Sequence, residues 1–328
     1  MIALLSMGIV VSCKDDKEDP KSQSRLEENY FTIENGKYVT GNFPEATSDE
    51  RITDVEMSDQ GMNGAVNFIT VTTPYEVKKF FLGIEGVSGY IEYNPGSSRA
   101  SEKHTYVLPL MIAQDYTGDA ELVMSAELED GSITIPSRHH LNYLETRPGA
   151  LEVKLAFSNE KDIDLHVFTP SGIHIYFNTS EDGYYFGEYG DEAYPFGLDI
   201  DSNAGCSIDG TNKENIYIPE EYVENGIYRV AVDLYENCDP SIPTSWSITA
   251  RYNGNLIQPI KGENPASGIF RVNAESSYCE NLVDVMTFEI KGARQSKLNL
   301  NSSRRGIRKK SDLHFSESQL NKILRQGK

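Results

Sequence analysis

Two short stretches in the second half of the chain carry oxygen-bearing side chains in a pattern that could bind a metal ion. In residues 198–205, Asp199, Asp201 and Asn203 alternate with apolar or small residues. Successive side chains of an extended segment point to opposite faces, so these three would share one face. Hard oxygen donors on one edge, followed by a glycine, are what Ca²⁺ requires of a loop. The stretch therefore predicts a calcium-type loop.

The spacing of this loop departs from that of an EF-hand. Counting from Asp199, Gly205 falls at the seventh position instead of the sixth, and Gly210 stands at the twelfth, where an EF-hand has Glu. No helical pattern flanks the loop. We therefore expect a calcium loop in a β-protein.

The stretch 162–167 repeats the alternation, with apolar residues on one side and Asp162, Asp164 and His166 on the other. Neighbouring carboxylates on one exposed face repel by roughly a few tenths of a kcal/mol. A cation between them and the Asp199/Asp201 pair would turn this cost into a gain. The alternative is that an acidic protein scatters Asp over its loops. The predicted ligands of a structural Ca²⁺ are Asp162, Asp164, Asp199, Asp201 and Asn203.

The N-terminus has the pattern of an export signal. Residues 2–11 are almost all apolar, a run too short to span a bilayer but suited to a signal peptide. Residues 10–13, Val-Val-Ser-Cys, resemble a bacterial lipobox, in which the Cys thiolate takes the lipid. This predicts a signal peptide over residues 1–12 and lipidation at Cys13. No basic region precedes the apolar run, so the true start codon could lie upstream. The alternative to a signal peptide is a buried N-terminal strand that contains a cysteine by chance.

The segment after Cys13 predicts where the protein resides. Residues 14–19, Lys-Asp-Asp-Lys-Glu-Asp, resemble the export signal of Bacteroidetes lipoproteins displayed on the cell surface. Residues 13–29 are polar without an apolar period, which predicts a flexible tether. We expect an outer-membrane lipoprotein exposed at the cell surface; the alternative is a solvated linker at the membrane.

The charge of the chain is unevenly distributed. The formal net charge is −20, yet residues 293–328 hold ten Lys and Arg against two Asp and Glu, a local charge of +8. Residues 1–292 therefore carry −28. So acidic a body argues against a nucleic-acid partner and suits cation binding.

The strand pattern predicts an all-β fold with two β-sandwich domains. Short, evenly spaced strands between turn signals predict an immunoglobulin-like domain over residues 30–147. Arg147-Pro148-Gly149 is the expected boundary, and alternation resumes in residues 148–292, which predicts a second sandwich of jelly-roll or immunoglobulin-like type. The expected strands are 65–71, 80–84, 89–93, 105–112, 121–127, 132–135, 151–157, 162–168, 173–177, 214–218, 226–233, 245–252 and 283–290.

Three cysteines follow the lipobox. An exported protein can form disulfides, so one bridge and one free thiol are expected. Cys206–Cys238 is favoured because it would staple the Asp199 loop, and Cys238–Cys279 remains an alternative. No Cys-x-x-Cys and no His/Cys cluster in the sequence indicates zinc.

Two further segments could contact partners. Residues 178–197 hold six aromatics and four glycines. Tyr184, Tyr185 and Tyr189 could stack on sugar rings or on a protein, or the segment could cover the sandwich end as a lid. The basic tail, residues 293–328, contains a capping-box pattern from Ser316 that predicts a short helix. The tail could dock on the acidic body, on anionic lipid or on a partner, or remain solvated.

Five short pieces of the second half resemble, in order, the YfaP-like family of exported bacterial β-sandwich domains. The resemblance implies a compact sandwich with acidic residues at one end, and it implies no reaction. Asp162, Asp164, Asp199 and Asp201 match its acidic part, and Asn215 matches its Glu-Asn-Ile part, where it would give an oxygen or cap the loop. The five pieces are residues 162–167, 170–172, 198–201, 214–216 and 226–230.

The sequence lacks the common catalytic motifs. It contains no Gly-x-Ser-x-Gly, no His-Glu-x-x-His and no phosphate-binding Gly loop. Asp162 and Asp164 lie too close on one strand to act on two sides of a sugar bond. The sequence therefore predicts a non-catalytic binding or scaffold module with a structural Ca²⁺. The alternatives are a glycan-capture protein of a polysaccharide-uptake system and an accessory subunit of an outer-membrane complex.

Overall fold

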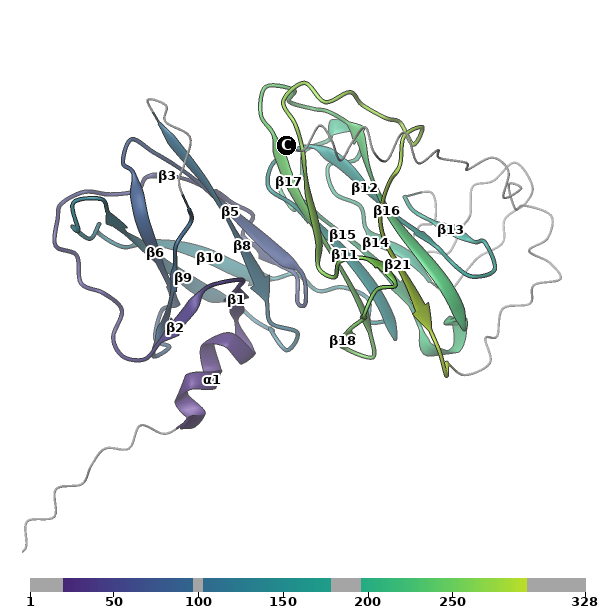
Figure 1. Cartoon of the computed structure of the whole chain (residues 1–328), viewed down its shortest axis with the longest axis horizontal. Coiled ribbons are helices and arrows are strands. Elements are labelled where there is room, and N and C mark those ends of the chain that lie inside the picture. The colour runs from purple at the N-terminus through teal and green to yellow at the C-terminus, as the bar shows by residue number, and fades with distance from the viewer. Residues whose placement is uncertain (1–19, 97–102, 178–195, 294–328) are drawn as a thin grey trace, which may run out of the picture.

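The computed structural model describes residues 20–96, 103–177 and 196–293, and its described part is all-β, as predicted. Two β-sandwiches lie side by side, and α1 extends from one end of the first (Figure 1). Cys13, the tyrosines Tyr184, Tyr185 and Tyr189, and the predicted tail helix lie outside the described residues. No helix of the described ranges is long and apolar enough to cross a membrane.

The first sandwich is built from two sheets, with strand orders β1-β8-β5-β3 and β2-β7-β6-β9-β10-β4. Alternation sets its core: along the central strand β8, every second side chain from Tyr106 to Ile112 is buried. These side chains pack against Phe80 and Leu82 of the other sheet. The elements are α1 (Pro20–Asn29), β1 (Phe31–Ile33), β2 (Lys37–Val39), β3 (Asp54–Met57), β4 (Gln60–Gly61), β5 (Val66–Thr73), β6 (Val77–Ile84), β7 (Tyr90–Tyr93), β8 (His104–Ile112), β9 (Ala120–Leu128) and β10 (Ser137–Tyr143).

Two sequence predictions for this sandwich differ from the structure. Residues 20–29 form helix α1 where a flexible tether was expected, and Leu26 of that helix is fully buried in the core. One buried apolar side chain gives no periodic signal, so the sequence could not reveal the helix. The strand expected over 132–135 forms only isolated bridges, while the polar segment 137–143 pairs with β9 as β10.

The second sandwich also contains two sheets. One has the order β14-β15-β11-β17-β18 with β20 beside β17, and the other has the order β13-β12-β16-β21-β19. Leu155, Ile163, Leu165 and Val230 fill the core between them, and Trp246 packs there as well. The elements are β11 (Leu151–Phe157), β12 (Asp162–Phe168), β13 (His174–Ile175), β14 (Gly197–Ile200), η1 (Ala204–Cys206), β15 (Lys213–Ile218), η2 (Glu220–Tyr222), β16 (Gly226–Glu236), β17 (Thr244–Tyr252), β18 (Asn255–Leu256), β19 (Lys261–Gly262), β20 (Ala266–Phe270) and β21 (Val283–Ile290).

Strand β11 is buried on both faces because the first sandwich covers its outer face. Lys154 of β11 donates two hydrogen bonds of 2.9 Å to the carbonyl and side-chain oxygens of Asn63, in the first sandwich. Its Nζ also lies 3.4 Å from Glu152 Oε2. Nearby, Thr249 donates to the carbonyl oxygen of Gly64 at 2.9 Å. The two sandwiches are therefore joined through a buried, hydrogen-bonded cation.

Removing this cation should weaken the whole chain. Lys154→Ala leaves the Glu152 carboxylate and two oxygens of Asn63 without their partner, and loss of one member of a buried ion pair costs about 3 kcal/mol. We expect the midpoint of urea unfolding to fall accordingly. Lys78→Ala, which removes the exposed pair with Glu127, should shift it far less. Equal shifts in the two variants would contradict a stabilising role for Lys154.

Candidate metal centre

The side chains of β12 divide between the core and a polar face. Ile163 and Leu165 point into the core, whereas Asp162, Asp164 and His166 occupy the opposite face. These three polar side chains are nonetheless only 1%, 2% and 0% exposed. Strand β12 therefore buries two carboxylates and an imidazole outside the apolar core.

A third carboxylate reaches this place from the other sheet. Strand β13 pairs only with the last two residues of β12, and no other strand of the described residues pairs with the part of that edge that precedes them, which we call the free edge of β12. Glu214 of β15 is fully buried on the core side of its sheet, and its Oε2 accepts a 2.6 Å hydrogen bond from the Leu165 N–H. The two sheets therefore meet at the free edge of β12 through a carboxylate.

Asp201 is the fourth carboxylate near this edge of β12, because an irregular register of β14 places it there. The β14–β15 register shifts between Leu198 and Ile200, so Ile200 lies opposite Asn215. Asp201 then falls beside Glu214. One ligand oxygen each from Asp164, Asp201 and Glu214 lies within 4.8 Å of the others. With Asp162, whose Oδ2 accepts a 2.7 Å hydrogen bond from the Gly205 N–H, we call these residues the acidic cluster. Its members are Asp162, Asp164, Asp201 and Glu214.

The acidic cluster is short of positive charge and of hydrogen-bond donors. Asp162 Oδ1, Asp164 Oδ2 and Glu214 Oε1 are buried without a hydrogen-bond partner. Within the described ranges, no salt bridge to Lys or Arg reaches any member of the cluster. Burying an unpaired carboxylate costs several kcal/mol, so these oxygens need a proton or a cation.

The pKa values of these carboxyl groups also reflect the lack of positive charge. Burial raises the pKa of Asp162 to about 6, and the charges of Asp201 and Glu236 add to the rise. Burial, followed by the neighbouring carboxylates, raises the pKa of Asp164 and of Glu214 well above their ordinary values. A divalent cation among these oxygens would reverse each of these shifts. Carboxylate oxygens are the ligands that Ca²⁺ prefers, so the residues present fit that ion.

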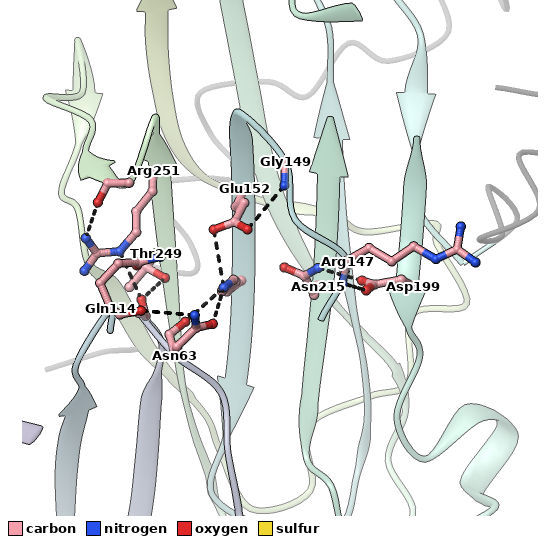
Figure 2. Close-up of polar contacts among 12 residues, drawn as sticks. Asn63, Gln114, Arg147, Gly149, Glu152, Asp199, Asn215, Thr249 and Arg251 are labelled. Carbon is pink, nitrogen blue, oxygen red and sulfur yellow. Dashed lines mark hydrogen bonds and ion pairs between the residues drawn. The ribbon is translucent and has the colours of Figure 1, made fainter. Parts of the chain in front are cut away.

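Two of the predicted ligands, Asp199 and Asn215, lie outside the acidic cluster. Asp199 Oδ2 accepts a 2.5 Å hydrogen bond from the Arg147 N–H, and its Oδ1 accepts one of 2.6 Å from Asn215 Nδ2 (Figure 2). Strict alternation would place Asp199 and Asp201 on one face, but the register shift separates them. The Asp199–Asn215 pair instead fixes the segment that connects the two sandwiches.

The predicted ligand Asn203 also has another role. Its Nδ2 donates to the carbonyl oxygen of Lys161 at 3.0 Å and to Asn212 Oδ1 at 2.8 Å. Its Oδ1 accepts a 3.0 Å hydrogen bond from the Asp209 N–H. Both polar atoms of the side chain therefore have partners within the loop, and Asn203 shapes the loop through them.

A disulfide holds the loop that follows Asp201. Cys206 at the end of η1 is bonded to Cys238, just beyond β16, which is the pairing the sequence favoured. The neighbouring Gly205 N–H donates to Asp162. The bridge therefore keeps the loop, and with it Asp201, against the start of β12.

The structure also assembles a group that the sequence did not indicate. Ligand atoms of Asp164, His166, Asp233 and Cys279 lie within 4.8 Å of one another. Asp233 of β16 is in register with Asp164, and Cys279 is a free thiol, so a His/Cys cluster exists that no sequence spacing reveals. The one available signal in the sequence is that Asp233 interrupts an apolar run, residues 230–234 of β16.

Comparison with known proteins gives little further information. No family model matches the chain, and no curated protein matches it. Fibronectin(III)-like modules of Clostridium thermocellum CbhA align over 56% of this chain and 87% of theirs, with 13% identity and a TM-score of 0.19. The Bacteroides ovatus mixed-linkage glucan utilization locus protein SGBP-B, solved with a mixed-linkage heptasaccharide, aligns over 74% of this chain and 62% of its own, with 14% identity and a TM-score of 0.17. TM-scores this low support no conclusion about function.

The fold and the site together define the class of protein: an all-β chain of two sandwiches with a buried group of carboxylates at one sheet edge. Carboxylates gathered in this way must retain protons or bind cations.

The metal-free protein should lose stability as the pH rises. Folded Asp162 has a pKa of about 6 against an ordinary 3.8, so between these values the folded state binds more protons than the unfolded state. In excess chelator, we expect the melting temperature to fall from pH 4 to pH 6 and to continue falling above it, because the pKa values of Asp164 and Glu214 are raised as well. Asp162→Asn should make the fall between pH 4 and pH 6 shallower. A melting temperature that rises through the window equally in both proteins would contradict the burial of this carboxyl.

Proposed function

We propose that this chain is an exported, lipid-anchored, non-catalytic binding or scaffold module whose second sandwich contains a structural Ca²⁺ in the acidic cluster. The observation that carries the proposal is the convergence of Asp162, Asp164, Asp201 and Glu214. Three of their oxygens are buried without a partner. A hard divalent cation satisfies both their charge and their lone pairs.

The ion would link the two sheets of the second sandwich. Asp162 and Asp164 belong to β12, in one sheet. Glu214 belongs to β15, in the other sheet, and Asp201 directly follows β14 of that sheet. A shared ion would tie the free edge of β12 to its neighbours. Binding to the folded state alone would add stability in proportion to the logarithm of the ion concentration.

Burial favours a structural role for this ion over a catalytic one. Asp162, Asp164 and Glu214 are 1%, 2% and 0% exposed, and only Asp201 reaches solvent. A catalytic metal needs an open coordination position that a substrate can reach. Because three of the four carboxylates are buried, the ion would lie mostly inside the protein and would serve the fold.

Two features support export of the protein. A disulfide persists in oxidising compartments, and Cys206–Cys238 is one. In the sequence, the lipobox pattern ending at Cys13 follows an apolar run and precedes an acidic segment. A surface-displayed protein meets millimolar Ca²⁺ readily, and a weak extracellular-type site would then be filled.

Asp201→Asn tests the ion directly, because Asp201 is exposed and its replacement should leave the fold intact. Ca²⁺ at a hundredfold excess over Kd adds about 2.7 kcal/mol, which corresponds to roughly 5 to 10 °C in the melting temperature of a chain of this size. We expect this rise in the unmodified protein and little or none in Asp201→Asn. Differential scanning fluorimetry with and without chelator measures both.

Asp199→Asn is the matched control. It changes the same residue type two positions away, at a carboxylate that hydrogen-bonds Arg147 and Asn215 instead of joining the acidic cluster. Its Ca²⁺-dependent rise should equal that of the unmodified protein. Loss of the rise in Asp199→Asn with retention in Asp201→Asn would reverse the ligand assignment. No rise in any of the three proteins would exclude the ion.

A further inference from the structure

The face of β12 and β16 that lies outside the core carries a second group of ligand atoms, different in chemistry from the acidic cluster. It comprises one imidazole, one thiol and two carboxylates, each offering an atom within 4.8 Å of the others. Asp164, His166 and Asp233 are buried, and Cys279 is partly exposed. We call the four residues the mixed cluster; they are Asp164, His166, Asp233 and Cys279.

The buried members of the mixed cluster have atoms with no partner. Asp164 Oδ2, His166 Nε2 and Asp233 Oδ1 are buried and make no hydrogen bond. His166 Nδ1 lies 2.9 Å from His174 Nε2, so Nε2 is the ring nitrogen that remains available to a ligand. Three unsatisfied buried atoms in one group are an observation independent of its composition, and they point to a missing ligand.

We propose that the mixed cluster is a second metal site, for Zn²⁺ or a cation of similar size and softness, beside the proposed calcium site. Thiolate and imidazole select such cations, whereas Ca²⁺ takes oxygen ligands. Four ligands of nitrogen, sulfur and oxygen match the usual coordination number of Zn²⁺. Asp164 belongs to both clusters, so its carboxylate would bridge the two ions.

Several contacts fix the ligands of this site in place. The Cys279 N–H donates to Asp233 Oδ2 at 2.8 Å, which orients the carboxylate and leaves Oδ1 available. The His166 ring stacks against His174 and Tyr176, with centroid distances of 5.1 and 5.5 Å. An imidazole held through its other nitrogen is how proteins commonly orient a metal ligand. Cys279, the most exposed member, marks the side from which an ion would enter.

Binding requires no oxidant or reductant. Burial, followed by the charges of Asp164 and Asp233, raises the pKa of the Cys279 thiol, so without a metal the sulfur keeps its proton. As the sulfur–metal bond forms, this proton leaves to solvent and the electron pair of the S–H bond becomes the pair donated to the ion. Cys206 and Cys238 are already bonded to each other, so they do not compete for Cys279.

Co²⁺ is a spectroscopic probe for this site, because a cobalt–thiolate bond gives a charge-transfer band in the near ultraviolet. Titration of the folded full-length chain should produce this band and saturate at one equivalent. Zn²⁺ should then remove the band, since it binds such ligands more tightly than Co²⁺, whereas excess Ca²⁺ should not. Cys279→Ser should abolish the band. Asp201→Asn, which alters only the acidic cluster, should retain it.

A second variant separates a built site from a reactive surface thiol. His166→Gln, checked for folding by circular dichroism, should weaken Co²⁺ binding at least tenfold, as loss of a ligand does. If His166→Gln does not fold, Asp233→Asn gives the same test. An undiminished affinity in the folded variant, or no band in the unmodified protein with a titratable free thiol, would overturn the proposal. Because the band reports Cys279 and the Ca²⁺-dependent melting reports Asp201, either site can fail without the other.

Discussion

The stability of the second sandwich depends on how its buried carboxylates are neutralised. Asp162, Asp164, Glu214 and Asp233 are each 2% exposed or less, and several of their oxygens have no hydrogen-bond donor. Burying an unpaired carboxylate lowers the free energy of unfolding by more than most single contacts raise it. The sandwich must therefore retain protons at these positions or bind cations there. The raised pKa of Asp162, about 6, is the first solution, and a divalent ion is the second. Only the second is compatible with full ionisation at neutral pH.

The geometry that creates this demand belongs to the tertiary structure. Among the described residues, the short strand β13 covers only the last two residues of β12, and the side chain of Glu214 reaches the preceding part of that edge from the opposite sheet. The register shift in β14 brings Asp201 to the same edge, and the disulfide from Cys206 keeps the following loop against β12. The short strand, the register shift and the disulfide are each local features. Their combined effect is to close one edge of the sandwich with acids instead of apolar side chains.

The sequence could predict those parts of the site that follow from a local residue pattern, and it could not predict those that arise from the tertiary structure. Alternation in residues 162–168 correctly separates the core side of β12 from its acidic side, and Asp201 lies in the cluster as the sequence indicated. The same rule fails at Asp199, because a one-residue register shift reverses the faces of a strand and leaves no mark in composition. Glu214 resembles an outward-facing acid until the fold shows that its side chain reaches Leu165. His166 and Cys279 meet because β12 pairs with β16 and the Cys279 N–H is bonded to Asp233 of β16, which no spacing rule contains.

The acidic cluster and the contact between the two sandwiches share strand β15. Glu214 points inward to the cluster, while its neighbours Lys213 and Asn215 are buried on the outer face, which the first sandwich and the connecting segment cover. Successive residues of one strand move together, so whatever fixes Glu214 also fixes Asn215 and, through Asp199, the Arg147 N–H at the start of the second sandwich. An ion bound at Glu214 would therefore stiffen the junction as well as the sheet edge. In the binding or scaffold module proposed above, this coupling would give the ion a structural purpose, because it would help to set the orientation of the second sandwich relative to the first.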